Sequence, residues 1–283
     1  MIELDNSLPG TRRRSAALLA LAFVALLLQP ASAQSQALPP ATAPATADVS
    51  VSLVLATDCS FSVSNDRFEL QKRGYAAAFR DPQVLNAIRS LGTQSIAVTM
   101  FQWTGPLLHV AVVDWTLIKD AASANAFADA VAAAPRQLFR GGTSISGAID
   151  YARVLLAQSP YKGARRIIDV SGDGSNNSGR PAATARDDAV ADGIAINGLP
   201  ILTVEPDLDI YYRDNVIGGP GAFMIPVANY DNFADAVLKK LINEIAARQV
   251  GADQIFVSQA SQTRPSLRQD STKSAIPAIA TAQ

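Results

Sequence analysis

Residues 49–62 read VSVSLVLATDCSFS and combine the pattern of a buried strand with a cluster of polar side chains. The second half of Val49–Thr57 is apolar nearly throughout, which is typical of a parallel strand that is buried on both faces. Directly after it, Asp58, Ser60 and Ser62 place a carboxylate and two hydroxyls at alternate positions. Because open α/β sheets bind their ligands at the carboxyl ends of strands, this stretch predicts both a sheet and the edge that carries its chemistry.

Short apolar runs alternate with helical patterns along the following 190 or so residues. The loop Thr104–Pro106 between two apolar runs predicts a hairpin, so that one strand runs antiparallel. Asp66 and Glu69 have the spacing of a capping box at the start of the first helix. We expect strands at 49–57, 95–103, 107–115, 165–171, 194–204 and 222–227, and helices at 64–80, 121–134, 144–158, 181–192 and 231–248. This order predicts an α/β fold with a doubly wound, mostly parallel six-stranded sheet, one antiparallel edge strand and helices on both faces.

The first 33 residues have the features of a signal peptide. Arg12–Arg14 form a positive segment, residues 16–28 are apolar, and Ala31–Ala33 is a small-residue cleavage site. An uncleaved membrane anchor is the alternative, but a bilayer span needs about 20 apolar residues. We therefore expect export, to the periplasm or the medium.

Composition divides the remaining chain into three parts. Residues 34–48 are rich in Pro, Ala and Thr and predict a disordered linker, residues 49–250 form one domain, and residues 251–283 predict a flexible tail. The chain of 283 residues is 48% hydrophobic with a formal net charge of -1, which argues against nucleic acid or an anionic membrane as partner. Cys59 is the only cysteine, so an intrachain disulfide is excluded and burial of this thiol is expected.

Two further loops are expected at the same edge as residues 58–62. Gly141-Gly142-Thr143 opens a predicted helix, and Asp173 follows a predicted strand within Ser171–Gly174. Five oxygen donors, from Asp58, Ser60, Ser62, Thr143 and Asp173, would then meet, without imidazole or thiolate. Such a donor set suits a hard cation. Mg²⁺ is the expected metal, and Mn²⁺ and Ca²⁺ also fit.

This arrangement resembles the metal-ion-dependent adhesion site of von Willebrand factor A domains, with D-x-S-x-S at 58–62, a Thr at 143 and an Asp at 173. The resemblance covers residues 49 to about 248. It implies that Ser60 and Ser62 bind the metal directly and Thr143 directly or through water, while Asp58 and Asp173 act largely through water and by charge. Residues 168–174 (IDVSGDG) and 217–223 (IGGPGAF) are closer still to uncharacterised bacterial exported A-domain-like proteins.

A metal held by few anionic ligands stays electrophilic, so the resemblance implies capture of an Asp or Glu carboxylate of a protein partner. Phe61, Tyr211, Tyr212 and Arg213 are candidates for contact with that partner, because aromatics and arginine are enriched at binding hot spots. Packing of these residues on their own fold is the competing interpretation.

Other functions remain as alternatives to adhesion. The serines could cap a helix, and Asp173 could be a turn residue. A metal-dependent hydrolase of the envelope lacks an evident general base, since His109 is the only histidine and lies in a predicted strand. The segment 142–146 (GTSIS) also fails the G-x-S-x-G pattern of serine hydrolases. A structural scaffold would have no use for the metal ligands. Catalysis is therefore not predicted.

Overall fold

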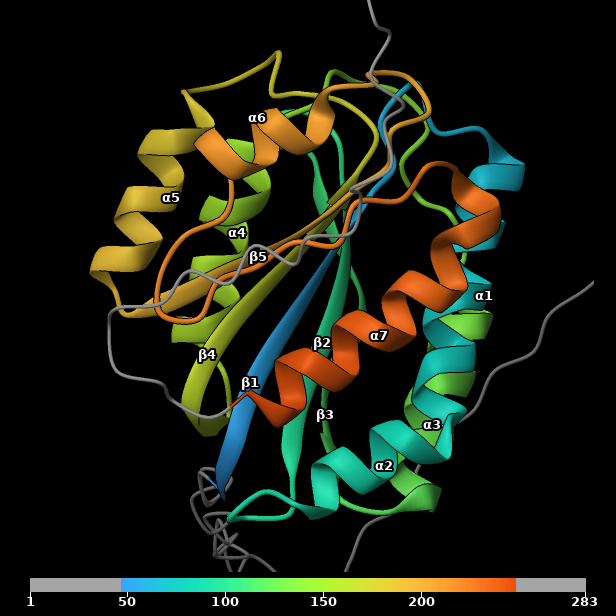
Figure 1. Cartoon of the computed structure of the whole chain (residues 1–283), viewed down its shortest axis with the longest axis vertical. Coiled ribbons are helices and arrows are strands. Elements are labelled where there is room, and N and C mark those ends of the chain that lie inside the picture. Colours follow the sequence, from blue (N-terminus) through green and yellow to red (C-terminus); the bar gives the residue numbers. More distant parts are fainter. Residues whose placement is uncertain (1–46, 248–283) are drawn as a thin grey trace, which may run out of the picture. The chain divides into compact units, whose positions relative to one another are not determined.

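The computed structural model describes residues 47–247, which form one five-stranded sheet between two layers of helices (Figure 1). Its strands are β1 (Ala47–Asp58), β2 (Ile96–Trp103), β3 (His109–Ile118), β4 (Tyr161–Gly172) and β5 (Ile194–Pro200), in the order β3-β2-β1-β4-β5. All neighbours are parallel except β2 and β3, so the antiparallel edge strand is confirmed. The predicted signal peptide, most of the predicted linker and the predicted tail lie outside the described residues.

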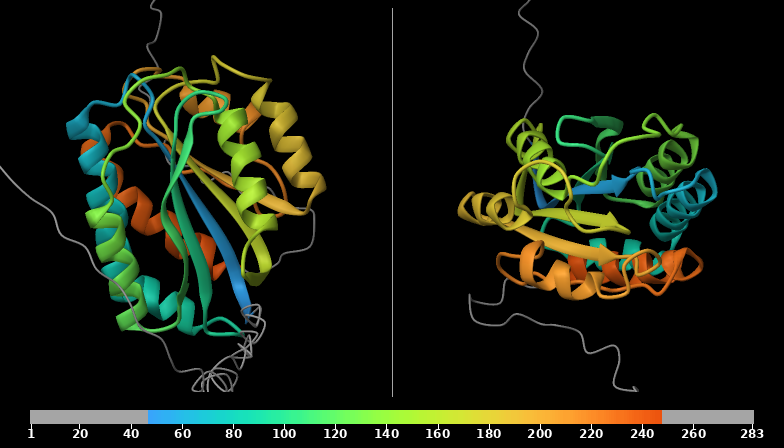
Figure 2. Two further views of the ribbon diagram at one scale, coloured as in Figure 1. Left: turned by 180° about the vertical axis from the view of Figure 1, so that it is seen from behind. Right: turned by 90° about the horizontal axis from the view of Figure 1, so that it is seen from above.

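Helices cover both faces of the sheet, as predicted (Figure 2). One core combines apolar side chains of the sheet with α1 (Asn65–Arg80), α2 (Pro82–Arg89), α3 (Ala121–Ala133) and α7 (Phe233–Ala246). A second core lies on the opposite face, against α4 (Ile145–Ala157), α5 (Ala182–Ala191) and α6 (Leu208–Asn215). Within residues 47–247, none of the helices has the length and apolar character needed to cross a bilayer.

The predicted sixth strand, residues 222–227, is not a strand of the sheet. This segment runs beside the end of β5, which it meets at the isolated bridges Gly198–Met224 and Ile201–Val227 and through the Phe223 amide on the Asn197 side chain. The amides of Ile225 and Val227 donate to the carbonyls of Gly198 and Pro200, but Pro200 has no N–H to donate in return, so a continuous ladder does not form. The sheet is therefore one strand narrower than predicted.

Three local predictions also need correction. The N-cap of α1 is Ser64, whose hydroxyl accepts from the Arg67 amide, and not the predicted capping box of Asp66 and Glu69. No helix was expected between residues 194–204 and 222–227, but Leu208–Asn215 form α6. The sequence reading missed α2 altogether, although Asp81 caps it and Pro82 opens it.

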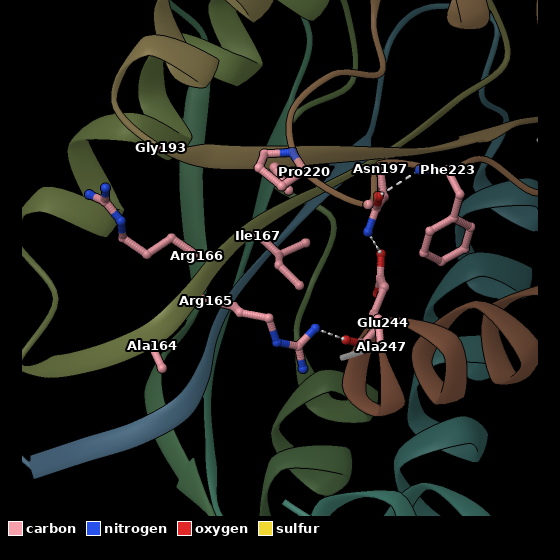
Figure 3. Close-up of a pocket in the computed structure, with 12 residues that line it drawn as sticks. Ala164, Arg165, Arg166, Ile167, Gly193, Asn197, Pro220, Phe223, Glu244 and Ala247 are labelled. Carbon is pink, nitrogen blue, oxygen red and sulfur yellow. Dashed lines mark hydrogen bonds between the residues drawn. The ribbon is translucent and has the colours of Figure 1, made fainter. Parts of the chain in front are cut away.

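A buried charged cluster lies between the sheet and α7. Lys240 of α7 reaches Asp169 of β4 at 2.5 Å and also pairs with Glu244, and all three side chains are almost fully buried. The Asn197 amide donates to Glu244 at 2.9 Å, and the Phe223 amide donates to Asn197 (Figure 3). Asn197, Phe223 and Glu244 line a small cavity of about 80 Å³ together with Arg165, which donates to the carbonyls of Glu244 and Ile245 in α7.

Gly163→Ala is expected to destabilise the fold, because β1 passes very close to this position of β4. An added Cβ would lie 2.5 Å from the Ser52 amide nitrogen and 2.7 Å from the Arg165 carbonyl oxygen, so backbone would have to move. Overpacking of this kind costs about 1–3 kcal/mol. Urea unfolding measures the loss in free energy of unfolding. Gly92→Ala is the control, since an added Cβ there meets nothing within 4 Å. Equal stabilities of the two variants would contradict this packing.

Candidate metal centre

The candidate site lies where the order of strands reverses. The chain leaves β1 for β2 on one side of it, and after the edge strand β3 it returns to β4 on the other side, so the ends of β1 and β4 open a crevice between them. Asp58 is the last residue of β1, and Asp173 directly follows β4. The Asp173 amide donates to Asp58 Oδ2 at 3.4 Å, which brings two fully buried acidic residues into contact.

The two serines of the first loop join this pair. The Ser60 amide donates to Asp58 Oδ1 at 2.7 Å, so the carboxylate of Asp58 folds the loop back over the strand end. The hydroxyls of Ser60 and Ser62 lie 3.2 Å apart, and the Ser62 hydroxyl donates to Asp173. Four of the five predicted residues therefore form one connected group.

Thr143 approaches the group from the loop before α4. Its amide donates to the Asn177 side chain at 2.9 Å, and its carbonyl accepts from the Asn177 amide. An added Cβ on Gly174, the neighbour of Asp173, would lie 3.5 Å from the Thr143 hydroxyl. Gly141 has φ +132°, and a Cβ there would lie 2.7 Å from the Thr104 hydroxyl oxygen, so this tight path requires glycine.

The electrostatics of the group favour a bound cation. Burial, together with the charge of Asp173, raises the pKa of Asp58 to about 7. Within residues 47–247 there is no cluster of three or more His, Cys, Asp or Glu side chains that could hold a metal. The donor set has instead two carboxylates and three hydroxyls, which is the chemistry of a hard, oxygen-bound cation. The residues present therefore fit a divalent ion such as Mg²⁺.

Two residues that were not predicted from the sequence, Arg67 and Tyr230, also contact this group, and a third, Glu205, lies beside it. Arg67 of α1 donates to the Ser62 carbonyl at 2.8 Å and lies 3.5 Å from Asp173 Oδ2. The Tyr230 hydroxyl donates to the same oxygen at 2.9 Å, and the Arg67 guanidinium lies over its ring. Glu205, beyond β5, accepts from the Ser175 amide and hydroxyl beside the Asp173 loop. Arg67 and Tyr230 thus fix the orientation of Asp173.

The four candidates for partner contact are placed very differently. The Phe61 side chain is 81% exposed beside the serines. Tyr212 is fully buried in the core beneath the site, so it is not available to a partner, because α6 turns its ring inward. Tyr211 is partly buried against the same core, and Arg213 is exposed and paired with Asp214.

The single cysteine and the single histidine have structural surroundings. Cys59 is fully buried between the metal-site residues, as predicted, and burial raises the pKa of its thiol. His109 stacks on Tyr151 with ring centroids 4.8 Å apart, and burial lowers its pKa.

Comparison with known proteins supports this fold. No curated protein sequence matches the chain. Among solved structures, proximal thread matrix protein 1 from the mussel byssus, with a zinc-occupied MIDAS motif, aligns with a TM-score of 0.51 and 14% identity over 71% of this chain and 49% of its own. The pilus adhesin SpaC from Lactobacillus rhamnosus GG aligns with a TM-score of 0.51 and 16% identity over 70% of this chain and 30% of its own.

A von Willebrand factor type A protein from Catenulispora acidiphila aligns less closely, with a TM-score of 0.49 and 16% identity over 70% of this chain and 42% of its own. The chain thus spans less than half the length of these structures, and at such identities the likeness shows the fold alone. A family model described as "Protein of unknown function (DUF1194)" matches residues 48–249. The chain therefore belongs to this family, DUF1194, whose fold is that of the von Willebrand factor A domain.

Proposed function

We propose that this protein is an exported, metal-dependent binding module, which captures an acidic side chain of a protein partner through a divalent cation. Asp58, Ser60, Ser62, Thr143 and Asp173 would hold the ion, and Mg²⁺ is the ion that we expect. The observation that carries the proposal is the contact of two buried carboxylates with two serine hydroxyls at one edge of the sheet, beside the loop of Thr143.

The balance of charge supports a binding role. Two carboxylates can offset a dication, while the neutral hydroxyls of Ser60, Ser62 and Thr143 leave it able to accept a further anionic ligand. When bound, the metal would supply that attraction. The chain's own residues orient the donors, since the Ser60 amide holds Asp58, and Arg67 and Tyr230 hold Asp173.

Two of the solved structures that share this fold are described in terms that match a metal-dependent binding role. The mussel protein is described with zinc in its MIDAS motif, and SpaC is described as a pilus adhesin. Metal binding and adhesion are thus both represented among proteins of this fold. An enzymatic role gains no comparable support, because the only histidine stacks on Tyr151 outside the donor set.

Ser60→Ala and Ser62→Ala are each expected to weaken Mg²⁺ binding by at least about 10-fold. Each substitution removes an oxygen donor without changing the charge of the site, and loss of even an outer partner of a metal site costs about 10–100-fold in affinity. Calorimetric titration of the chain with MgCl₂ measures the effect. Ser178→Ala, on a neighbouring loop outside the donor set, should bind like the wild type. Unchanged affinity in both serine variants would contradict the proposed site.

A further inference from the structure

Large exposed apolar side chains gather around the proposed metal centre. Of the seven such residues described within 47–247, five lie on loops at the carboxyl edge of the sheet. We call these five the apolar rim: Phe61, Leu107, Leu108, Phe139 and Val204. Phe61, Leu107 and Phe139 are 81%, 90% and 57% exposed. Exposed apolar groups that gather in one place mark binding surfaces more often than isolated ones do.

Contacts between the loops show that the rim belongs to one surface. The hairpin of Leu107 and Leu108 packs on the Thr143 loop, because the Ser144 amide donates to the Thr104 carbonyl at 2.8 Å. Arg136 joins the loops of the two phenylalanines, since its guanidinium donates to the Cys59 carbonyl and lies 5.3 Å from the ring centre of Phe139. The loops that carry the rim therefore adjoin the loops that carry the donors, at the carboxyl ends of β1 and β4, at the top of Figure 1.

Charge is distributed unevenly around this surface. Arg136 donates to the carbonyls of Cys59 and Leu138 and to the Asn65 amide oxygen. All three acceptors are uncharged, so they do not neutralise the positive charge of Arg136. Arg140 is exposed next to Phe139. The opposite side, beyond β5, carries Glu205 and Asp207 instead. The part of the rim formed by Phe61 and Phe139 is thus aromatic and basic, which complements an acidic partner that also offers an apolar side chain.

We propose that the partner is a protein segment in which the metal-binding Asp or Glu lies next to a large apolar residue, and that this residue packs on Phe61 and Phe139. This inference rests on the proposed function, because it assigns the surroundings of the same metal centre. Aromatic anchors with an adjacent arginine provide most of the affinity of many interfaces. The metal would then set the requirement for an acid, and the apolar rim would select its neighbours.

The experiment is a selection of displayed random 12-residue peptides on the immobilised chain in MgCl₂, followed by binding measurements with synthetic copies. We expect enrichment of peptides with Asp or Glu beside Phe, Trp or Leu, bound in Mg²⁺ and released by EDTA. The double variant Phe61→Ser, Phe139→Ser should bind them at least about 10-fold more weakly, the scale of one hot-spot contact. Its Mg²⁺ affinity, measured by calorimetry, should equal that of the wild type.

The control is Val154→Ser, which removes an exposed apolar side chain near the far end of α4 and should leave peptide binding unchanged. Peptides that need Mg²⁺ but bind the double variant equally well would overturn this inference while leaving the proposed function intact. Peptides that bind the chain equally well in EDTA and in Mg²⁺, or the absence of any enriched peptide, would overturn both this inference and the proposed role of the metal.

Discussion

Asp58→Asn is expected to abolish the stabilisation of this protein by Mg²⁺. The wild type at 100 times its dissociation constant should gain about 2.7 kcal/mol over the same protein in EDTA. The amide of the variant can still accept from the Ser60 amide, as Asp58 does at 2.7 Å, so the loop keeps its shape. It lacks the negative charge that a buried dication requires. Thermal unfolding with and without MgCl₂ measures the difference.

The metal-free state supplies an internal control for this variant. Burial and the neighbouring charge of Asp173 raise the pKa of Asp58 to about 7, so its ionised form is unfavourable when no cation is present. In EDTA at pH 8 we therefore expect Asp58→Asn to be at least as stable as the wild type. A variant that unfolds earlier in EDTA, or one that still gains stability from Mg²⁺, would contradict the role assigned to Asp58.

Lys240→Met is expected to destabilise the domain by about 3–5 kcal/mol at pH 8, because it leaves two buried acids without their cation. Lys240 is fully buried and pairs with both Asp169 and Glu244. Burial raises the pKa of both acids, that of Glu244 to about 7, whereas the charge of Lys240 opposes this shift, so the ionised acids depend on Lys240. Urea unfolding in EDTA measures the cost without interference from bound metal.

Glu244→Gln is the matched control for this cluster. It leaves one Lys240–Asp169 pair and keeps an amide oxygen for the Asn197 side chain, so we expect a much smaller loss than in Lys240→Met. Equal losses in the free energy of unfolding of the two variants, or a loss below about 1 kcal/mol in Lys240→Met, would contradict this account. Lys240 would then not stabilise the domain by neutralising the buried acids.

The sequence predicted the parts of this molecule that follow from short-range patterns. The apolar half of β1 and the polar residues after it lie as expected, because parallel strands end at a common edge and Asp58 and Asp173 terminate neighbouring strands. The same rule could have identified Glu205, which follows β5 at that edge. Glu205 directly follows the predicted strand 194–204 and was overlooked there, although β5 itself ends at Pro200.

The other features that were not predicted correctly are a contact between residues far apart in the sequence, a helix, and a segment wrongly expected to be a strand. Tyr230 lies 57 residues from Asp173 along the chain, and no spacing in the sequence links them. Leu208 and Tyr212 are both buried and four residues apart, a helical spacing that the sequence offered but for which no helix was predicted. Residues 222–227 have the composition of a strand, but Pro200 at the end of β5 has no N–H to donate to them, which interrupts the ladder.

The most direct test of the metal centre is anomalous diffraction from a crystal of residues 34–283 grown with MnCl₂, since Mn²⁺ accepts the same oxygen ligands and scatters anomalously. The account predicts an anomalous peak in the crevice beyond β1 and β4, within coordination distance of the Ser60 and Ser62 hydroxyls. A crevice without a peak at saturating Mn²⁺, or a peak bound elsewhere with Asp58 and Asp173 uninvolved, would contradict it.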